Sequence, residues 1–410
     1  MNIVFHRYNS ICEPDFIEAF HKLGIEVIED RGEMTDKNIP LEDRVERLTR
    51  LVLEQQPVFV FTINFFPYIS MICEKLHVLY VAVSVDCPVT EIYSREIKNT
   101  CNRIFLFDRV QYESIVSENP SGIFHLPLGA NAERIDRTLE ERCGKMGSGS
   151  SGTGAGAAQG GYRYDVSFVG SLYKEKDPYL DYKGKLAPWD RGFFDGLVQA
   201  QLKVPGQSLI EETVGEKQIS VLRQMDPGFY PSDYSVHDIS HFVAVNHYLS
   251  PHLTYLERVR NLNLLAQYFS VDFFTRSDTS DLKGVHCHGG VSSLTEMPEV
   301  FRRSKINLNM TLRSIQTGLP QRIWDVLACR GFLLTNYQAE LPDCFVIGQH
   351  LEAYETPAEM AEKIDYYLKH EEEREEITEA GYLYVKEHAT VEMRVAQMIR
   401  IIMEGMEACP

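Results

Sequence analysis

The stretch "TGLPQRIWDVLACRGF", residues 317–332, holds residue types that can bind an anion and a diol. Gly318 lets the backbone approach a neighbour closely, and Pro320 suits the first position of a helix. The N-terminal end of a helix attracts anions, and the guanidinium of Arg322 suits phosphate oxygens. Asp325, one turn later on the same face, can accept hydrogen bonds from ribose hydroxyls. The pattern therefore fits a nucleoside diphosphate.

A plainer interpretation of the same residues stays open. Arg322 and Asp325 are three positions apart, so they can form an ion pair on a solvated helix face. Such a pair stabilises a helix by about 0.2–0.5 kcal/mol and binds nothing. Spacing alone favours this second interpretation.

The elements that must position these residues alternate along the chain. Apolar runs of strand length, such as "NIVFH", "VFVFTIN" and "LYVAVSV", are separated by amphipathic helical segments such as "LEDRVERLTRLVLEQ". A second alternating series begins at Tyr162 with "YDVSFVGSLY" and continues through "VDFFTR", "KINLNM" and "GFLLTN". Such alternation predicts parallel sheets covered by helices on both faces. We expect an α/β protein of two Rossmann-like domains facing each other across a cleft.

Length and composition set the expected domain boundaries. A chain of 410 residues fits two domains of roughly 150–200 residues each. We expect one domain over residues 1–135 and a second over 163–390. Residues 136–162 include the low-complexity run "GSGSSGTGAGAAQGG" and predict a flexible linker. A last helix, 391–410, is expected to return to the first domain.

Several motifs resemble one known family. The strongest is G-x-P-x-R-x-x-D-x-L-A-C-x-G-F over 318–332, supported by "VSFVGSLY" (166–173), "SVDCPV" (84–89) and "FHLPLGAN" (124–131). Together they resemble the CgeB-like glycosyltransferases of the spore-maturation type, which have the GT-B fold. The resemblance implies transfer of a sugar, of hexosyltransferase type, from a nucleotide-activated donor. It also implies that Asp325 binds the ribose. Retaining relatives have a Glu eight positions before that carboxylate, where this chain has Thr317, so the resemblance does not decide between retention and inversion.

Further donor-binding residues are expected at the ends of strands in the second domain, where parallel sheets bind ligands. Gly170 and Ser171 would lie near the diphosphate, and Gly290 and Val291 beside the base. The remaining candidates are Arg276 and Asn309. Each of these has an equally ordinary interpretation as a strand-to-loop turn or a packing residue.

The first domain must supply a general base if the reaction inverts the sugar. Asp86 is the first candidate because it lies in the "SVDCPV" motif, and His6, which follows the first strand, is the second. Each also has a structural interpretation.

Charge and motifs limit the remaining function classes. The net charge of −18 argues against nucleic-acid partners, and no run is long enough for a membrane span. Nine scattered cysteines and no signal peptide predict a cytoplasmic protein. The "HCH" triplet at 286–288 is expected to be strand rather than a metal site, and no D-x-D is present, so no metal or other cofactor is expected. The absence of G-x-G-x-x-G argues against an NAD enzyme. The acceptor is a glycan, a protein or a small molecule. The alternative is a non-catalytic nucleotide- or glycan-binding protein with the same fold.

Overall fold

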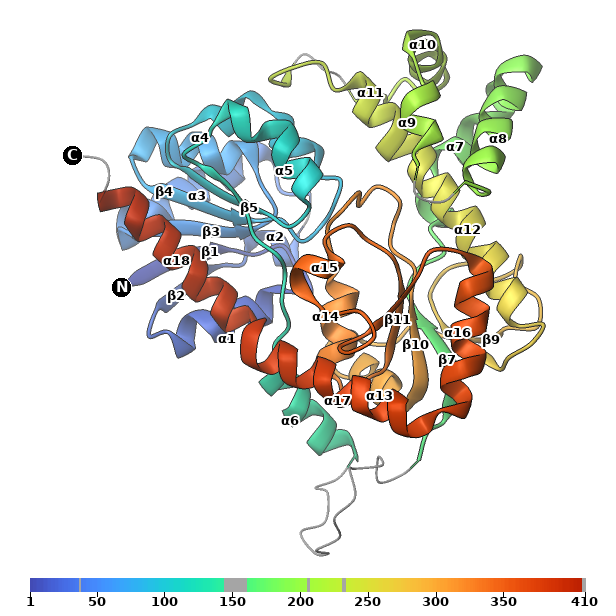
Figure 1. The fold of residues 1–410 in the computed structure, drawn as a ribbon. Coiled ribbons are helices and arrows are strands. Elements are labelled where there is room, and N and C mark those ends of the chain that lie inside the picture. Colours follow the sequence, from blue (N-terminus) through green and yellow to red (C-terminus); the bar gives the residue numbers. More distant parts are fainter. Residues whose placement is uncertain (37, 144–160, 205–206, 231–233, 408–410) are drawn as a thin grey trace, which may run out of the picture.

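The protein consists of two parallel six-stranded sheets, each covered by helices (Figure 1). A computed structural model describes residues 1–36, 38–143, 161–204, 207–230 and 234–407. The expected α/β architecture of two Rossmann-like domains is confirmed.

The first sheet contains β1 (Asn2–His6), β2 (Glu26–Asp30), β3 (Phe59–Ile63), β4 (Leu79–Val83), β5 (Asn102–Leu106) and β6 (Ile123–His125). Its order is β2-β1-β3-β4-β5-β6 and every pairing is parallel. All residues of β3 are buried, as expected for a central strand covered on both faces. Its helices are α1 (Glu13–Lys22), α2 (Gly32–Thr35), α3 (Leu41–Gln55), α4 (Pro67–Leu76) and α5 (Arg109–Ile115).

The second sheet contains β7 (Tyr164–Val169), β8 (Val271–Phe274), β9 (His286–His288), β10 (Ser304–Asn309), β11 (Leu333–Asn336) and β12 (Glu352–Tyr354). Its order is β12-β11-β10-β7-β8-β9. The chain order reverses between β7 and β10, and ligands of such sheets bind where it reverses. Its other helices are α13 (Met297–Arg302), α14 (Gln321–Ala328), α15 (Leu341–Cys344), α16 (Pro357–Lys369) and α17 (Glu371–His388).

A helical insertion separates β7 from β8 and stands above the second sheet at the upper right of Figure 1. It comprises α7 (Pro178–Tyr182), α8 (Pro188–Gln201), α9 (Leu209–Thr213), α10 (Glu216–Met225), α11 (Ser240–Val243), the π-helical segment η7 (Ala244–Leu249) and α12 (Ser250–Leu265). The N–H of Val236 donates to the carbonyl of Tyr93 at 2.8 Å. The insertion therefore also contacts the first domain.

The connection between the domains differs from the expectation. Residues predicted to begin the linker at 136 continue helix α6 (Ala132–Cys143), whose Ile135 and Leu139 pack against apolar neighbours. Their spacing of four places both on one helix face. Residues 144–160, which contain most of the Gly/Ser-rich run, lie outside the described residues.

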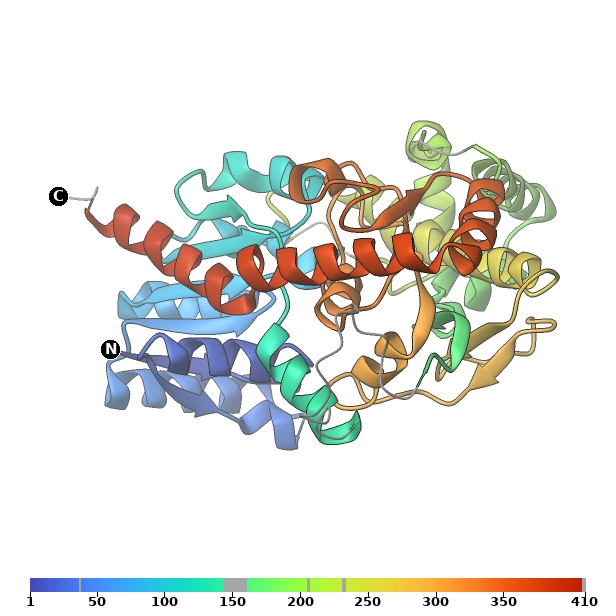
Figure 2. The same cartoon turned by 60° about the horizontal axis from the view of Figure 1, so that its bottom comes forward.

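The last helix, α18 (Val391–Glu407), packs on the first domain. Val395, Met398 and Ile402 are buried with Phe16 and Phe20 of α1. Figure 2 shows α17 and α18 running in succession along the length of both domains. No helix among the described residues is long and apolar enough to cross a membrane.

Candidate functional site

Helix α14 presents two charged side chains from an otherwise apolar unit. Ile323, Trp324 and Val326 are fully buried, which leaves Arg322 and Asp325 on the remaining face. Their side chains are only 24% and 16% exposed, and Arg322 Nη1 lies 4.0 Å from Asp325 Oδ2. The ion pair that spacing favoured is therefore present, but it is partly buried and does not lie on a solvated helix face.

Burial leaves both charges poorly compensated. It raises the pKa of the Asp325 carboxyl, against the opposing effects of Arg322 and of a 3.0 Å hydrogen bond from Gln321. It also lowers the pKa of the Arg322 guanidinium, which contacts the Met297 sulfur and lies over the Phe301 ring at 5.2 Å. A ligand that brings an anion to Arg322 and hydroxyl donors to Asp325 would relieve both costs.

Arg258 of α12 is a second buried cation, which the sequence interpretation missed. It is 6% exposed, and its Nη atoms donate to the carbonyls of Ser171 (2.6 Å) and Met310, at the ends of β7 and β10. Its Nε has no hydrogen-bond partner and no carboxylate pairs with it among the described residues. Burial lowers its pKa. An uncompensated cation where the strand order reverses is a site for an anion.

One sequence signal could have revealed Arg258. Within "SPHLTYLERVRNLNLL" it lies three residues after Tyr255 and four before Leu262, both buried. An arginine inside the apolar stripe of a helix needs a partner, and no acidic residue shares that stripe.

The backbone before α14 is already occupied, which corrects one expectation. Asp108 Oδ2 accepts the N–H groups of Gln316, Thr317 and Gly318 at 2.8, 2.9 and 2.9 Å. A Cβ on Gly318 would lie 2.8 Å from the Asp108 Cα. Gly318 thus allows close approach of the first domain and not of a phosphate.

Thr317 and Glu340 form part of the same contact between the domains. Glu340, 3% exposed, accepts hydrogen bonds from the Thr317 hydroxyl (2.7 Å), the Arg109 N–H (2.8 Å) and His125 Nε2 (2.8 Å). The position where retaining relatives have Glu therefore carries a hydroxyl that holds the domains together.

Of the other donor-site candidates, three come together at the ends of β8 and β9. A Cβ on Gly290 would lie 2.4 Å from Arg276 Cγ, so the arginine packs over that glycine. Val291 follows directly and packs partly buried beside α14. These three residues form one wall on the β9 side of the sheet.

Gly170, Ser171 and Asn309 are bound to protein groups. Gly170 donates its N–H to Phe274 (3.1 Å), and the Ser171 hydroxyl donates to Glu175 (2.6 Å). Asn309 is 4% exposed and pairs in register with Thr335 of β11, whose hydroxyl accepts its amide at 2.9 Å. Asn309 therefore links two strands and does not face a ligand.

Asp86 is exposed at the carboxyl edge of the first sheet. It lines a pocket of about 380 Å³ together with Tyr8, Asn64 and Glu91. The amide of Asn64 donates to its Oδ2 at 2.7 Å, which fixes the carboxylate without burying it. An accessible, oriented carboxylate can accept a proton from an acceptor hydroxyl.

His6 has no such freedom. It is fully buried, with Nδ1 2.8 Å from Asp30 and Nε2 3.2 Å from the Tyr68 hydroxyl and 3.4 Å from Glu33. Burial would lower the pKa of the imidazole, but the two carboxylates outweigh it and raise the pKa. A fully buried imidazole whose two ring nitrogens are both engaged by protein groups has no access to an acceptor hydroxyl, so the structure argues against this candidate.

Cys12 at the start of α1 shows that the two domains face each other across this site. Burial raises the pKa of its thiol, and the charges of Asp325, Asp15 and Asp86 raise it further. Carboxylates from α14 and from the loop after β4 thus act on one buried group. The candidate ribose ligand and the candidate base are therefore both close enough to Cys12 for their charges to act on its thiol.

Comparison with known proteins supports this architecture. Residues 260–400 match the family described as "Glycosyl transferase-like". The fold is similar to the crystal structure of a glycosyltransferase from Rickettsia africae ESF-5, at 12% identity and a TM-score of 0.51, covering 99% of both chains. HepE of Anabaena in complex with UDP-glucose aligns at 10% identity and a TM-score of 0.46, covering 98% of this chain and 100% of that one. The BGT protein of phage T4 with UDP-glucose aligns at 9% and 0.47, covering 99% of both.

At this identity the likeness to the Rickettsia enzyme shows the fold alone: the protein has the GT-B architecture of two Rossmann-like domains around a cleft. No curated protein matches the chain by sequence. The family match lies in the part of the chain that carries Arg322 and Asp325.

Proposed function

We propose that the protein is a glycosyltransferase that moves a sugar from a nucleotide-activated donor to an acceptor. One observation carries the proposal: Arg258, buried where the strand order of the second sheet reverses, lies close enough to Arg322 for the two charges to interact, and the Asp325 carboxylate lies 4.0 Å from Arg322. The cations match a diphosphate and the carboxylate matches ribose hydroxyls.

The finer assignments rest on this arrangement and on the resemblance. The enzyme is a CgeB-like hexosyltransferase that works without a metal, because the guanidinium groups supply the positive charge. Asp86 removes the proton from the acceptor hydroxyl as it attacks the anomeric carbon. The acceptor is a glycan, a protein or a small molecule, and the protein acts in the cytoplasm.

A second candidate is a nucleotide- or glycan-binding protein without turnover. Asp108 favours it, because its carboxylate occupies three backbone N–H groups at the start of the α14 loop. The same groups are then unavailable to stabilise charge that develops on a departing diphosphate.

Thermal unfolding in the presence of nucleotides and nucleotide-sugars tests the proposal. Binding to the native state raises Tm by an amount set by ligand concentration over Kd. We expect a nucleotide-sugar to raise Tm and to be hydrolysed slowly without acceptor. Stabilisation without hydrolysis or transfer supports the non-catalytic candidate, and no stabilisation by any nucleotide overturns both.

A further inference from the structure

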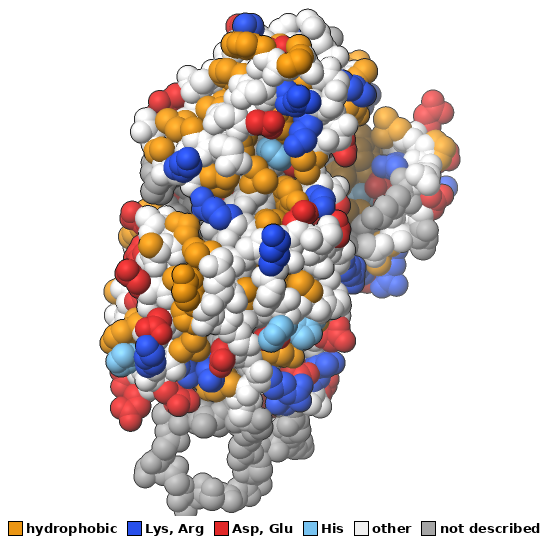
Figure 3. All heavy atoms as spheres, turned by 90° about the vertical axis from the view of Figure 1, so that its right-hand side faces the viewer, with side chains coloured by type: hydrophobic (Ala, Val, Ile, Leu, Met, Phe, Trp, Pro, Cys, Tyr) orange, Lys and Arg blue, Asp and Glu red, His pale blue; other side chains and the backbone are white. Residues whose placement is uncertain are grey.

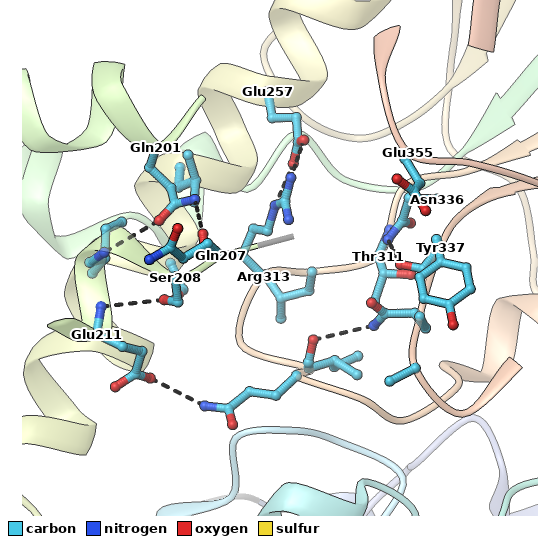
Figure 4. Close-up of a pocket in the computed structure, with 18 of the residues that line it drawn as sticks. Gln201, Gln207, Ser208, Glu211, Glu257, Thr311, Arg313, Asn336, Tyr337 and Glu355 are labelled. Atoms are coloured by element: carbon cyan, nitrogen blue, oxygen red, sulfur yellow. Dashed lines mark hydrogen bonds and ion pairs between the residues drawn. The ribbon is translucent and has the colours of Figure 1, made fainter. Parts of the chain in front are cut away.

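A hollow in the second domain lies between the helical insertion and the ends of β10, β11 and β12. Its volume is about 580 Å³, within the range of about 300–1,000 Å³ typical of small-molecule sites. Figure 4 shows Gln207, Ser208 and Glu211 of the insertion on one side and Asn336, Tyr337 and Glu355 on the other. The donor candidates Arg258, Arg322 and Asp325 are not among the residues that line it.

Hydrogen-bonding groups line this pocket together with apolar side chains. Amides, hydroxyls and carboxylates line it, and Tyr337, 42% exposed, offers an aromatic face with a phenol at its edge. Sugars present many hydroxyls and one apolar ring face, so this combination suits them. Anchoring by amides and an aromatic side chain is directional and favours a polyhydroxylated ligand over an apolar one.

Asn246 supplies an independent sign of a missing ligand. It lines the pocket, is 2% exposed, and its Nδ2 has no hydrogen-bond partner among the described residues. A buried donor left unpaired costs about 1–3 kcal/mol. It lies in the π-helical segment η7, and π-helical turns inside helices occur frequently at functional sites.

The charge of the pocket excludes a phosphate. Glu211, Glu257 and Glu355 contribute three carboxylates, and Arg313 is the only cation among the described lining residues. Both Nε and Nη2 of Arg313 are bonded to Glu257, with Nε at 2.8 Å. No free cation remains among the described lining residues for an anionic ligand, so a nucleoside diphosphate does not fit here.

We propose that this pocket binds a sugar residue of the acceptor that carries no negative charge and is not the residue whose hydroxyl attacks the donor beside Asp86. The acceptor role rests on the proposed glycosyltransferase function, whereas binding of the sugar does not. The insertion thus gives the enzyme a specificity site of its own, lined by none of the donor candidates.

Saturation-transfer NMR on the full chain without nucleotide tests the binding, with glucose, glucosamine and glucuronate as probes of one size. We expect saturation transfer to glucose and glucosamine, which shows that they bind, and none to glucuronate. Tyr337→Ala should weaken binding about tenfold through loss of one hydrogen bond and a ring contact. Tyr268→Ala, which removes a 69% exposed tyrosine outside the pocket, should change nothing. Asn246→Ala tests the buried donor if the variant folds.

A charge swap tests the exclusion of anions. Glu355→Lys should admit glucuronate, whereas Glu362→Lys on the exposed face of α16 should not. Three results would overturn the proposal: no saturation transfer to any probe, equal saturation transfer to glucose and glucuronate in the wild type, or undiminished saturation transfer in Tyr337→Ala.

Donor hydrolysis separates this inference from the proposed function. If the protein hydrolyses a nucleotide-sugar but binds none of the three probes, the proposed enzymatic function is retained and the proposed sugar pocket is rejected. If the protein binds a sugar probe but neither binds nor hydrolyses any nucleotide-sugar, the pocket binds sugar but is not an acceptor site.

Discussion

One cluster of buried charges in each domain differs from the other in how its charges are compensated. In the first domain, His6, Asp30 and Glu33 form a closed network, completed by Arg47, whose Nε donates to Asp30 at 2.8 Å. In the second, Arg258 has no acidic partner among the described residues, and Arg322 and Asp325 lie 4.0 Å apart. A satisfied network stabilises a fold, whereas uncompensated buried charges bind a ligand.

One face of the molecule is mixed in charge. On the face shown in Figure 3, basic side chains are interspersed with acidic and uncharged ones.

The largest expected effect is the loss of turnover when Asp86, the accessible carboxylate of the first domain, is replaced. Asp86→Asn should lower kcat about 10²–10⁴-fold, the range for a lost general base, and leave nucleotide affinity unchanged. Glu91→Gln, in the same pocket, is the matched control and should retain turnover. Steady-state transfer assays measure both variants. Full turnover in Asp86→Asn would remove this residue from the mechanism.

Removing one charged side chain from each cluster tests the comparison directly. Asp30→Ala leaves His6 and Arg47 buried without their shared carboxylate and should destabilise the protein by about 3–5 kcal/mol without changing nucleotide affinity. Arg258→Met should change stability by less than about 2 kcal/mol, because an apolar chain replaces an unpaired charge, but should weaken diphosphate binding. Urea unfolding and calorimetry measure the two quantities. A large loss of stability in Arg258→Met together with a loss of nucleotide affinity in Asp30→Ala would contradict the roles assigned to the two clusters.

The α14 pair should separate sugar from phosphate recognition. Asp325→Ala should weaken a nucleoside and its diphosphate alike, by about 1.5–3 kcal/mol or ten- to hundred-fold. Arg322→Ala should weaken the diphosphate much more than the nucleoside. Lys305→Ala, at the amino end of β10, removes an equal charge from the far edge of the sheet and should have no effect. Equal affinities in the wild type and both α14 variants would reduce the pair to packing.

The smallest expected effect is a pH dependence of the first-domain network. The pKa of His6 is raised in the folded protein, so the folded state binds more protons than the unfolded state between about pH 6.5 and that higher pKa. The stability that His6 contributes is complete below about pH 6.5 and is lost as pH rises through the folded pKa. The loss is about 1.4 kcal/mol for each pH unit that separates the folded pKa from the unfolded one. Urea unfolding of the wild type and His6→Gln from pH 5.5 to 9 should show this decline in the wild type alone. A parallel decline in both proteins would assign it to other groups.

The sequence was sufficient to predict features that depend on residues close together in the chain. Apolar runs of strand length and helical spacing predicted both parallel sheets, because burial on two faces requires continuous apolar strands. The placement of Arg322 and Asp325 on one helix face was also predicted, since their spacing of three brings them together, whereas their role in binding stays a prediction. The linker prediction failed at 136–143, where helical spacing outweighed the neighbouring low-complexity composition.

Only the tertiary structure decided which polar groups are free. The parallel register of β1 and β2 sets His6 beside Asp30, and that of β10 and β11 sets Asn309 beside Thr335, so both candidates are occupied. Docking of the domains brings Asp108 to the backbone of Gly318, more than two hundred residues away in the chain. Folding of α12 onto β7 leaves Arg258 without an acid partner among the described residues. Sequence determines which side chains share a strand or a helix face, but hydrogen-bond partners distant in sequence are set by packing, and these partners determine which groups remain available to a ligand.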